Sequence, residues 1–133
     1  MKRFTIGLSA ALIAAVVCTS SCGRSYKAAD SDDILTILSE SGIEASGEFT
    51  RKTVTIPEEF GDVYKRYNEL QKEQGFDLYD YRSREADVYT FEVISVHGER
   101  APETQAHVMV CDGKIIGGDL SSPAIDGAMA PLF

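Results

Sequence analysis

The dipeptide Asp112-Gly113 separates two β-favouring runs, and it restricts the fold of this chain more than any other feature. Asp-Gly suits the two-residue type I′ turn, whose twist matches that of two antiparallel strands. We therefore expect residues 105–111 and 114–120 to form a β-hairpin. An antiparallel sheet must then be part of the fold.

A two-residue turn also fixes which residues of the hairpin lie opposite each other. The expected pairs are Cys111 with Lys114, Val110 with Ile115, Val108 with Gly117, and His107 with Gly118. This register gives one smooth aliphatic face, formed by Ala106, Val108, Val110, Ile115 and Gly117. We expect the helix that starts at Pro57 to pack on this face, with Gly117 allowing its close approach. The opposite face carries His107, Met109, Cys111, Lys114 and Ile116.

The remaining segments predict two helices and two further β segments. Ser31-Asp32-Asp33 can cap a helix over residues 32–41, which Gly42 ends. Residues 43–56 favour one strand or a loose hairpin, and the strand pattern returns from Asp87. A second helix is expected to start at Pro57 and to end at Gly75. Three- and four-residue steps give it an aromatic and apolar face, formed by Phe60, Val63, Tyr64, Tyr67, Leu70 and Gln71.

The predicted fold class is therefore α+β, with two helices packed on one face of a small antiparallel sheet. The predicted order is helix, strand, helix and three strands. Residues 31–133 are expected to form a single domain.

The N-terminus is typical of an exported precursor. Lys2 and Arg3 precede an apolar run that is too short for a comfortable membrane span, which indicates a signal peptide over residues 1–21. Ser21 places a small residue before Cys22, as lipoprotein signal peptidase requires, whereas the bulky Val17 precedes Cys18. We expect Cys22 to be lipidated and to hold the protein on the outer face of the membrane. Simple cleavage and secretion is the alternative.

Removal of the signal peptide makes the chain strongly acidic. It leaves 13 − 2 = 11 basic residues against 21 acidic residues, a formal charge of −10. Such a surface disfavours nucleic acid and gives no electrostatic affinity for anionic lipids. Residues 22–30 are expected to be the lipidated cysteine and a short tether. The expected partners are the membrane, through the lipid, and an envelope protein or wall component.

Four blocks of sequence resemble the domain of unknown function 4830 family. They are residues 67–78 (YNELQKEQGFDL), 88–91 (VYTF), 115–119 (IIGGD) and 126–127 (DG). The resemblance implies a small extracytoplasmic domain of Gram-positive, clostridia-like bacteria, often carried on a lipoprotein and without an assigned activity. Residues 82–85 and 97–103 depart from the family pattern, and we expect variable surface loops there.

No catalytic site or cofactor is predicted. Cys111 and His107 could form a nucleophile and base, but four residues along a strand separate them by about 13 Å. Asp119 and Asp126 are weak candidates for metal ligands, because they lack the pattern of a calcium loop. We consequently predict no metal site.

A non-enzymatic binding or interaction module is the favoured function. Tyr79 and Tyr81, in a polar stretch, could form its interaction surface. The alternatives are a hydrolase-like enzyme that uses His107, Asp119 and Cys111, or a peptidase inhibitor or regulator suggested by fold analogy alone. Convergence of those three side chains in a pocket would favour the enzyme.

Overall fold

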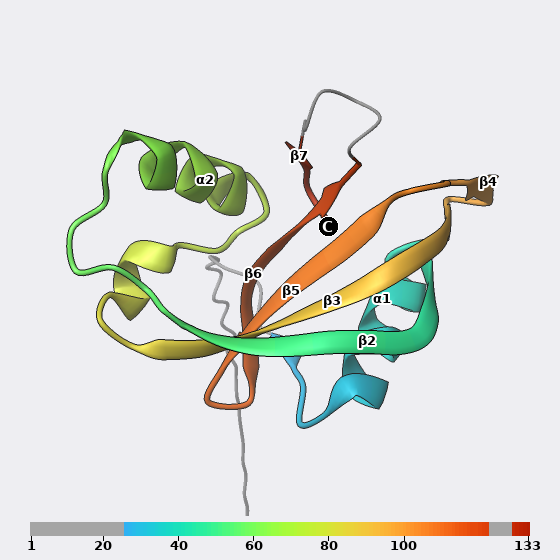
Figure 1. Cartoon of the computed structure of the whole chain (residues 1–133), viewed down its shortest axis with the longest axis horizontal. Helices are drawn as coiled ribbons and strands as arrows, with labels where there is room; N and C mark the ends of the chain where they lie inside the picture. The colour runs from blue at the N-terminus through green and yellow to red at the C-terminus, as the bar shows by residue number, and fades with distance from the viewer. Residues whose placement is uncertain (1–25, 123–128) are drawn as a thin grey trace, which may run out of the picture.

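A computed structural model of the protein describes residues 26–122 and 129–133 (Figure 1). Cys22 and Asp126 lie outside the described residues. The elements are β1 (Tyr26–Lys27), α1 (Ser31–Glu40), β2 (Ile43–Thr55), α2 (Asp62–Glu73), a short 3-10 helix η1 (Leu78–Tyr81), β3 (Glu85–Val96), β4 (Glu99–Arg100), β5 (Gln105–Cys111), β6 (Lys114–Ser121) and β7 (Met129–Ala130). The α+β class is confirmed, and the main elements follow the predicted order.

Within the described residues, the sheet has seven antiparallel strands, whose central path runs β1-β6-β5-β3-β2. The short strands β4 and β7 pair with β3 and β6. Consequently β2 forms one edge of the sheet, whereas β6 has β1 and β7 along different parts of its outer side. Among the described residues, no helix combines the length and apolarity needed to cross a membrane.

Two predicted boundaries are corrected. Tyr26 and Lys27, expected in the tether, pair with β6, so the fold begins before Ser31. The helix predicted from Pro57 begins only at Asp62, with Gly61 as its N-cap. Ile56 explains the delay, because its N–H donates to Arg84 and its carbonyl accepts from Ser83, which prolongs the extended chain. The predicted end at Gly75 is confirmed by its positive φ of 91°.

The hairpin turn is confirmed, but its register changes after two pairs. Asp112 and Gly113 both have positive φ, of 51° and 73°, as a type I′ turn requires. Ile116 then has no partner in β5, so Gly117 lies opposite Met109 rather than Val108. The predicted pairs of Val108 with Gly117 and His107 with Gly118 are therefore wrong. The observed pairs are Val108 with Gly118 and His107 with Asp119.

This β-bulge also changes the faces. Ile116 packs with Met109, and a Cβ built on Gly117 would meet Gln71 and Leu78. Both residues therefore face α2, because a bulge places two neighbouring residues opposite one. Gly117 does lie close to α2, as expected, but on the face opposite to Val108.

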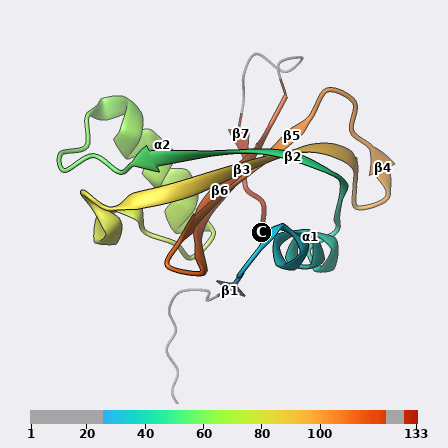
Figure 2. The same ribbon diagram turned by 60° about the horizontal axis from the view of Figure 1, so that its bottom comes forward.

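The two helices pack against opposite faces of the sheet, so the expectation of one shared face is wrong. Ile34 and Leu38 of α1 belong to a core cluster with Val108, and α1 lies beneath the sheet in Figure 2. Tyr64 and Tyr67 of α2 pack on a second cluster, built from Ile56, Leu78, Ala86, Met109, Cys111 and Ile116. Neighbouring strand residues point to opposite faces, and both faces are apolar in this sheet.

We predict that Gly117→Ala destabilises the protein by about 1–3 kcal/mol, as overpacking of a core does. The added Cβ would lie 2.9 Å from Oε1 of Gln71 and 3.3 Å from Cδ2 of Leu78. Gly47→Ala is the matched control, because nothing lies within 4 Å of its added Cβ. Urea unfolding measures both variants, and equal stabilities would contradict the close packing of α2 at Gly117.

Candidate functional site: a groove beside the second helix

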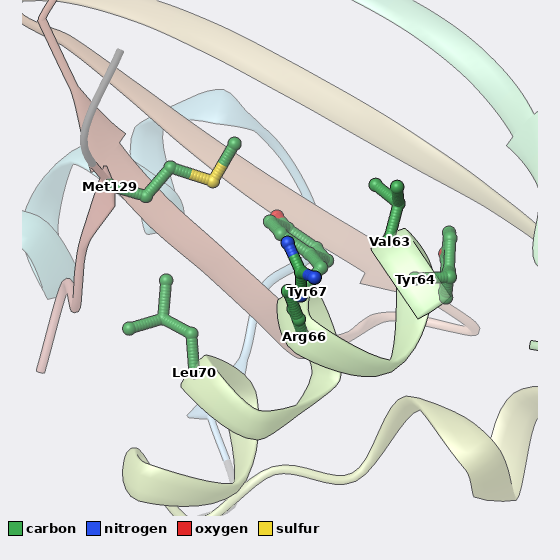
Figure 3. Close-up of a pocket in the computed structure, with 6 residues that line it drawn as sticks. All are labelled: Val63, Tyr64, Arg66, Tyr67, Leu70 and Met129. Carbon is green, nitrogen blue, oxygen red and sulfur yellow. The ribbon is translucent and has the colours of Figure 1, made fainter. Parts of the chain in front are cut away.

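An open groove of about 570 Å³ lies between α2 and β7. Its lining is largely apolar and comprises Val63, Tyr64, Arg66, Tyr67, Leu70 and Met129. Figure 3 shows α2 along one side and Met129 projecting from the other. Val63 is 80% exposed and Met129 is 53% exposed. Apolar side chains from two elements therefore meet solvent at one place, as they do at many binding sites.

Val63 was expected on the apolar face of the second helix, together with Tyr64 and Tyr67. The structure rotates α2 so that Asn68, which was not expected on this face, is buried together with Gln71. Val63 consequently lies beside the buried face and forms the outer wall of the groove.

A row of aromatic rings forms the inner wall and continues beyond the groove. Tyr64 lies between Tyr67 and Phe60, with ring centroids 6.1 Å and 4.6 Å away. Phe60 in turn contacts Tyr79, at 5.5 Å. All three contacts are edge-to-face, the arrangement that aromatic rings favour. The row fixes the tyrosines that line the groove.

A buried carboxylate supports the groove from below. The Tyr67 hydroxyl donates a hydrogen bond of 2.8 Å to Oδ1 of Asp119, which is only 2% exposed. Among the described residues, Oδ2 of Asp119 has no hydrogen-bond partner. Burial raises the pKa of the Asp119 carboxyl, although the Tyr67 hydrogen bond and the charge of His107 act in the opposite direction. Burial and the neighbouring Asp119 also raise the pKa of the Tyr67 hydroxyl, which therefore stays a donor at neutral pH.

Two glutamine side chains hold α2 against the sheet. Oε1 of Gln71 accepts from the Gly118 N–H at 2.7 Å, and Nε2 of Gln74 donates to the Gly118 carbonyl at 3.0 Å. Oε1 of Gln74 also accepts from the N–H groups of Leu132 and Phe133, at 2.7 Å and 3.2 Å. The side-chain amides thus form hydrogen bonds with the backbone of β6 at Gly118, between the residues of β6 that pair with β1 and those that pair with β7.

His107 lies directly opposite Asp119 in the pairing of β5 with β6, within a polar row that crosses the sheet. Its Nδ1 is 2.9 Å from Oγ1 of Thr90, and its Nε2 is 3.0 Å from Oγ of Ser121. Both ring nitrogens therefore have hydroxyl partners, and neither makes a hydrogen bond to Cys111 or Asp119. Cys111 is a buried free thiol in the cluster beneath α2.

The structure therefore does not assemble His107, Asp119 and Cys111 into one pocket. None of the three lines the groove. Asp119 bonds to Tyr67, His107 bonds to Thr90 and Ser121, and Cys111 packs among apolar side chains. In residues 26–122 and 129–133, no three His, Cys, Asp or Glu side chains gather where they could hold a metal ion.

The two tyrosines of the predicted interaction surface have different surroundings. Tyr79 is exposed, and the guanidinium of Arg82 lies 3.8 Å from its ring centroid. Tyr81 packs partly against the cluster beneath α2. Tyr79 thus lies at the far end of the aromatic row from Tyr67, and neither Tyr79 nor Tyr81 lines the groove.

Sequence reasoning missed the polar contacts beneath the groove. The helical repeat placed Gln71 on the apolar face of the second helix. A glutamine at such a position indicates a buried side-chain amide that needs hydrogen-bond partners. Asp119, at the end of an apolar strand, was a comparable signal for a buried carboxylate. The partners themselves, Tyr67 and Gly118, depend on the bulge at Ile116 and could not be assigned from the sequence.

We predict that Asp119→Asn changes the pH dependence of stability. A carboxyl whose folded pKa is raised stabilises the fold fully below its unfolded pKa of about 3.9, and this contribution is lost as pH rises through the folded pKa. The wild type should therefore lose stability relative to Asp119→Asn as pH rises from that value, because asparagine cannot ionise. Urea unfolding at a series of pH values tests this.

The control is Asp80→Asn, which removes an exposed carboxylate of η1 away from the groove. A constant stability difference between the wild type and Asp119→Asn across the pH series would contradict a raised pKa at Asp119.

Comparison with known proteins supports the resemblance found in the sequence. The sequence model described as "Domain of unknown function (DUF4830)" matches residues 42–120, from the end of α1 to near the end of β6. No curated protein matches the chain, and no solved structure does. The matched region spans β2, α2, β3, β5 and most of β6, more than half of the chain. The protein therefore belongs to the DUF4830 family.

Proposed function

We propose that the protein is a lipid-anchored binding module of the cell envelope, and that the groove beside α2 is its binding site. The observation that carries the proposal is the exposure of Val63 and Met129 on opposite walls of one apolar groove. Arg66 is the charged residue among the described residues that line it. The ligand would accordingly have an apolar part and an acidic group. A segment of an envelope protein in which apolar residues stand next to an aspartate or glutamate has both.

The contacts beneath the groove support a binding role. Tyr67 is fixed by Asp119 below and by Tyr64 beside it, so the apolar wall is formed before a ligand arrives. A preformed wall lowers the entropy lost on binding. The groove lining includes tyrosine, arginine and methionine, which are enriched at protein interfaces.

We predict that Val63→Asp weakens the binding of anilinonaphthalene sulfonate by about tenfold or more, a loss of about 1.4 kcal/mol. This dye combines apolar rings with an acidic group, and its fluorescence rises on binding to an apolar site. The new carboxylate would repel the sulfonate and interrupt the apolar wall. Val63 is so exposed that the change should leave folding intact.

Ile94→Asp is the matched control, because Ile94 is also exposed but lies on β3 outside the groove. Arg66→Ala should weaken the same binding by removing the positive charge. Dye binding that is equal in the wild type and Val63→Asp would refute the groove as a site for this class of ligand.

The anchor gives a separate prediction. Cys22→Ala removes the thiol that the acyl chains require, and each buried methylene of such chains contributes about 0.8 kcal/mol to membrane affinity. The variant should move from the membrane fraction to the soluble fraction. Ultracentrifugation and immunoblotting measure the change, with Cys18→Ala as the matched control. A Cys22→Ala variant that still sediments with membranes would contradict lipid anchoring.

A further inference from the structure

The outer side of β2 is a long, open sheet edge. β2 spans Ile43–Thr55 and pairs only with β3 among the described strands. Residues 48–53 are all exposed, and Phe49 is 42% exposed. An open edge presents unpaired N–H and C=O groups that can pair with another strand. The sequence of β2 indicates which strand fits best.

The exposed part of β2 is complementary to a second copy of itself. If two copies pair antiparallel about a twofold axis at Thr50, each Glu48 lies opposite a Lys52 and each Phe49 lies opposite an Arg51. Directly opposite residues share a face of the sheet and contact each other. The pairing therefore gives two ion pairs on the α2 face and two cation–π contacts on the α1 face.

Glu48 and Lys52 are available for this pairing, whereas the Arg51 guanidinium already lies 3.6 Å from the Asp87 carboxylate. In the described part of the chain, neither Glu48 nor Lys52 has an ion-pair partner. On the other face, Phe49 lies 5.5 Å from the Tyr89 ring, and the Arg51 guanidinium lies 5.8 Å from the same ring. A second copy would extend this cluster of aromatic rings and guanidinium across the edge.

Neighbouring registers lack this match. A twofold axis at Arg51 would bring two arginines together, and like charges directly opposite destabilise a strand pair. An axis at Phe49 would place Glu48 opposite Thr50 and leave Lys52 without an opposite charge. A lysine on an edge strand usually discourages pairing. Here Glu48 removes that penalty in one register alone.

We infer that the protein forms a homodimer through antiparallel pairing of β2 with its copy, centred on Thr50. β2 carries Glu44, Glu48, Arg51 and Lys52, so its charges balance in a chain with a formal charge of −8. Two acidic molecules can therefore approach each other along this strand with little repulsion. The shared interface is isologous, as expected for a twofold dimer.

The size of the contact sets its strength. β2 pairs regularly with β3 from Phe49 to Thr55, but the register shifts between Ala45 and Phe49 limit regular pairing on the other side of Thr50. The contact thus centres on the five pairs from Glu48 to Lys52. Such a small interface favours a weak dimer, which confinement to a membrane surface would strengthen. β1 and the groove lie toward the opposite edge of the sheet, so dimerisation leaves both accessible.

A cysteine at Thr50 tests the register directly. Two copies of Thr50→Cys would have their sulfur atoms opposite each other and should form an intermolecular disulfide when an oxidant is added to cells that carry the full chain. Thr55→Cys is the matched control, because it is exposed on the same strand but would lie about 30 Å from its copy. We expect at least about tenfold more dimer for Thr50→Cys on a non-reducing gel, a contrast that the distance limits of a disulfide impose.

A charge exchange tests the pairing without relying on a disulfide. In the Thr50→Cys background, Lys52→Glu would place two carboxylates opposite each other and should reduce the dimer about tenfold. Glu48→Lys should have a similar effect. The double variant Glu48→Lys/Lys52→Glu restores opposite charges and should restore the dimer.

Three results would overturn the inference. They are equal cross-linking of Thr50→Cys and Thr55→Cys, no rescue by the charge exchange, and cross-linking of Thr50→Cys to a different protein instead of its copy. The wild-type chain gives the background from its own cysteines, and Cys111 is buried. These results do not depend on dye binding, so the dimer and the groove can fail separately.

Discussion

The hydrogen bonds that Gly118 donates to Gln71 and accepts from Gln74 determine how α2 packs on the sheet. A side-chain amide carries the same donor and acceptor groups as a peptide unit, so it can satisfy the backbone of a strand where no other strand lies alongside. Gln71, Gln74 and Gly118 are all buried, and each unmade bond would leave a polar group without a partner. These bonds fix the rotation of α2 about its axis. The rotation in turn leaves Val63 at the surface and points Tyr67 toward Asp119.

The molecule has two exposed regions that differ in chemistry and position. The groove lies beside β6 and β7 and is apolar, with Arg66 on its lining. The open strand β2 lies at the other edge of the sheet and carries balanced charges around Phe49. Two such sites on one domain would let the protein associate with itself while it binds a different ligand. Of the three side chains considered for catalysis, Asp119 supports the groove through its hydrogen bond to Tyr67, whereas His107 and Cys111 have other structural partners.

Local chemistry decided which features could be predicted from the sequence. The turn at Asp112-Gly113 and the helix end at Gly75 depend on residues that favour particular backbone angles, so both predictions were confirmed. The predicted start of α2 at Pro57 was wrong. Ile56 forms backbone hydrogen bonds with Ser83 and Arg84, and these outweigh the preference of proline for the first turn of a helix. The groove could not be predicted, because a periodic pattern does not distinguish Val63 from the residues that are buried beside it. The same is true of Asp119, whose partner Tyr67 lies 52 residues away in the sequence.

The bulge at Ile116 determines which face of the sheet each later residue of β6 points to. Each residue after it points to the side that its neighbour would occupy in a regular strand, so Gly118 and Leu120 face the α1 cluster while Asp119 faces Tyr67. If the same sequence paired without the bulge, the two sides would be exchanged and the Asp119 carboxylate would lie among the aliphatic side chains next to α1. The one extra residue in β6 therefore decides that Asp119, and not a neighbour, faces Tyr67.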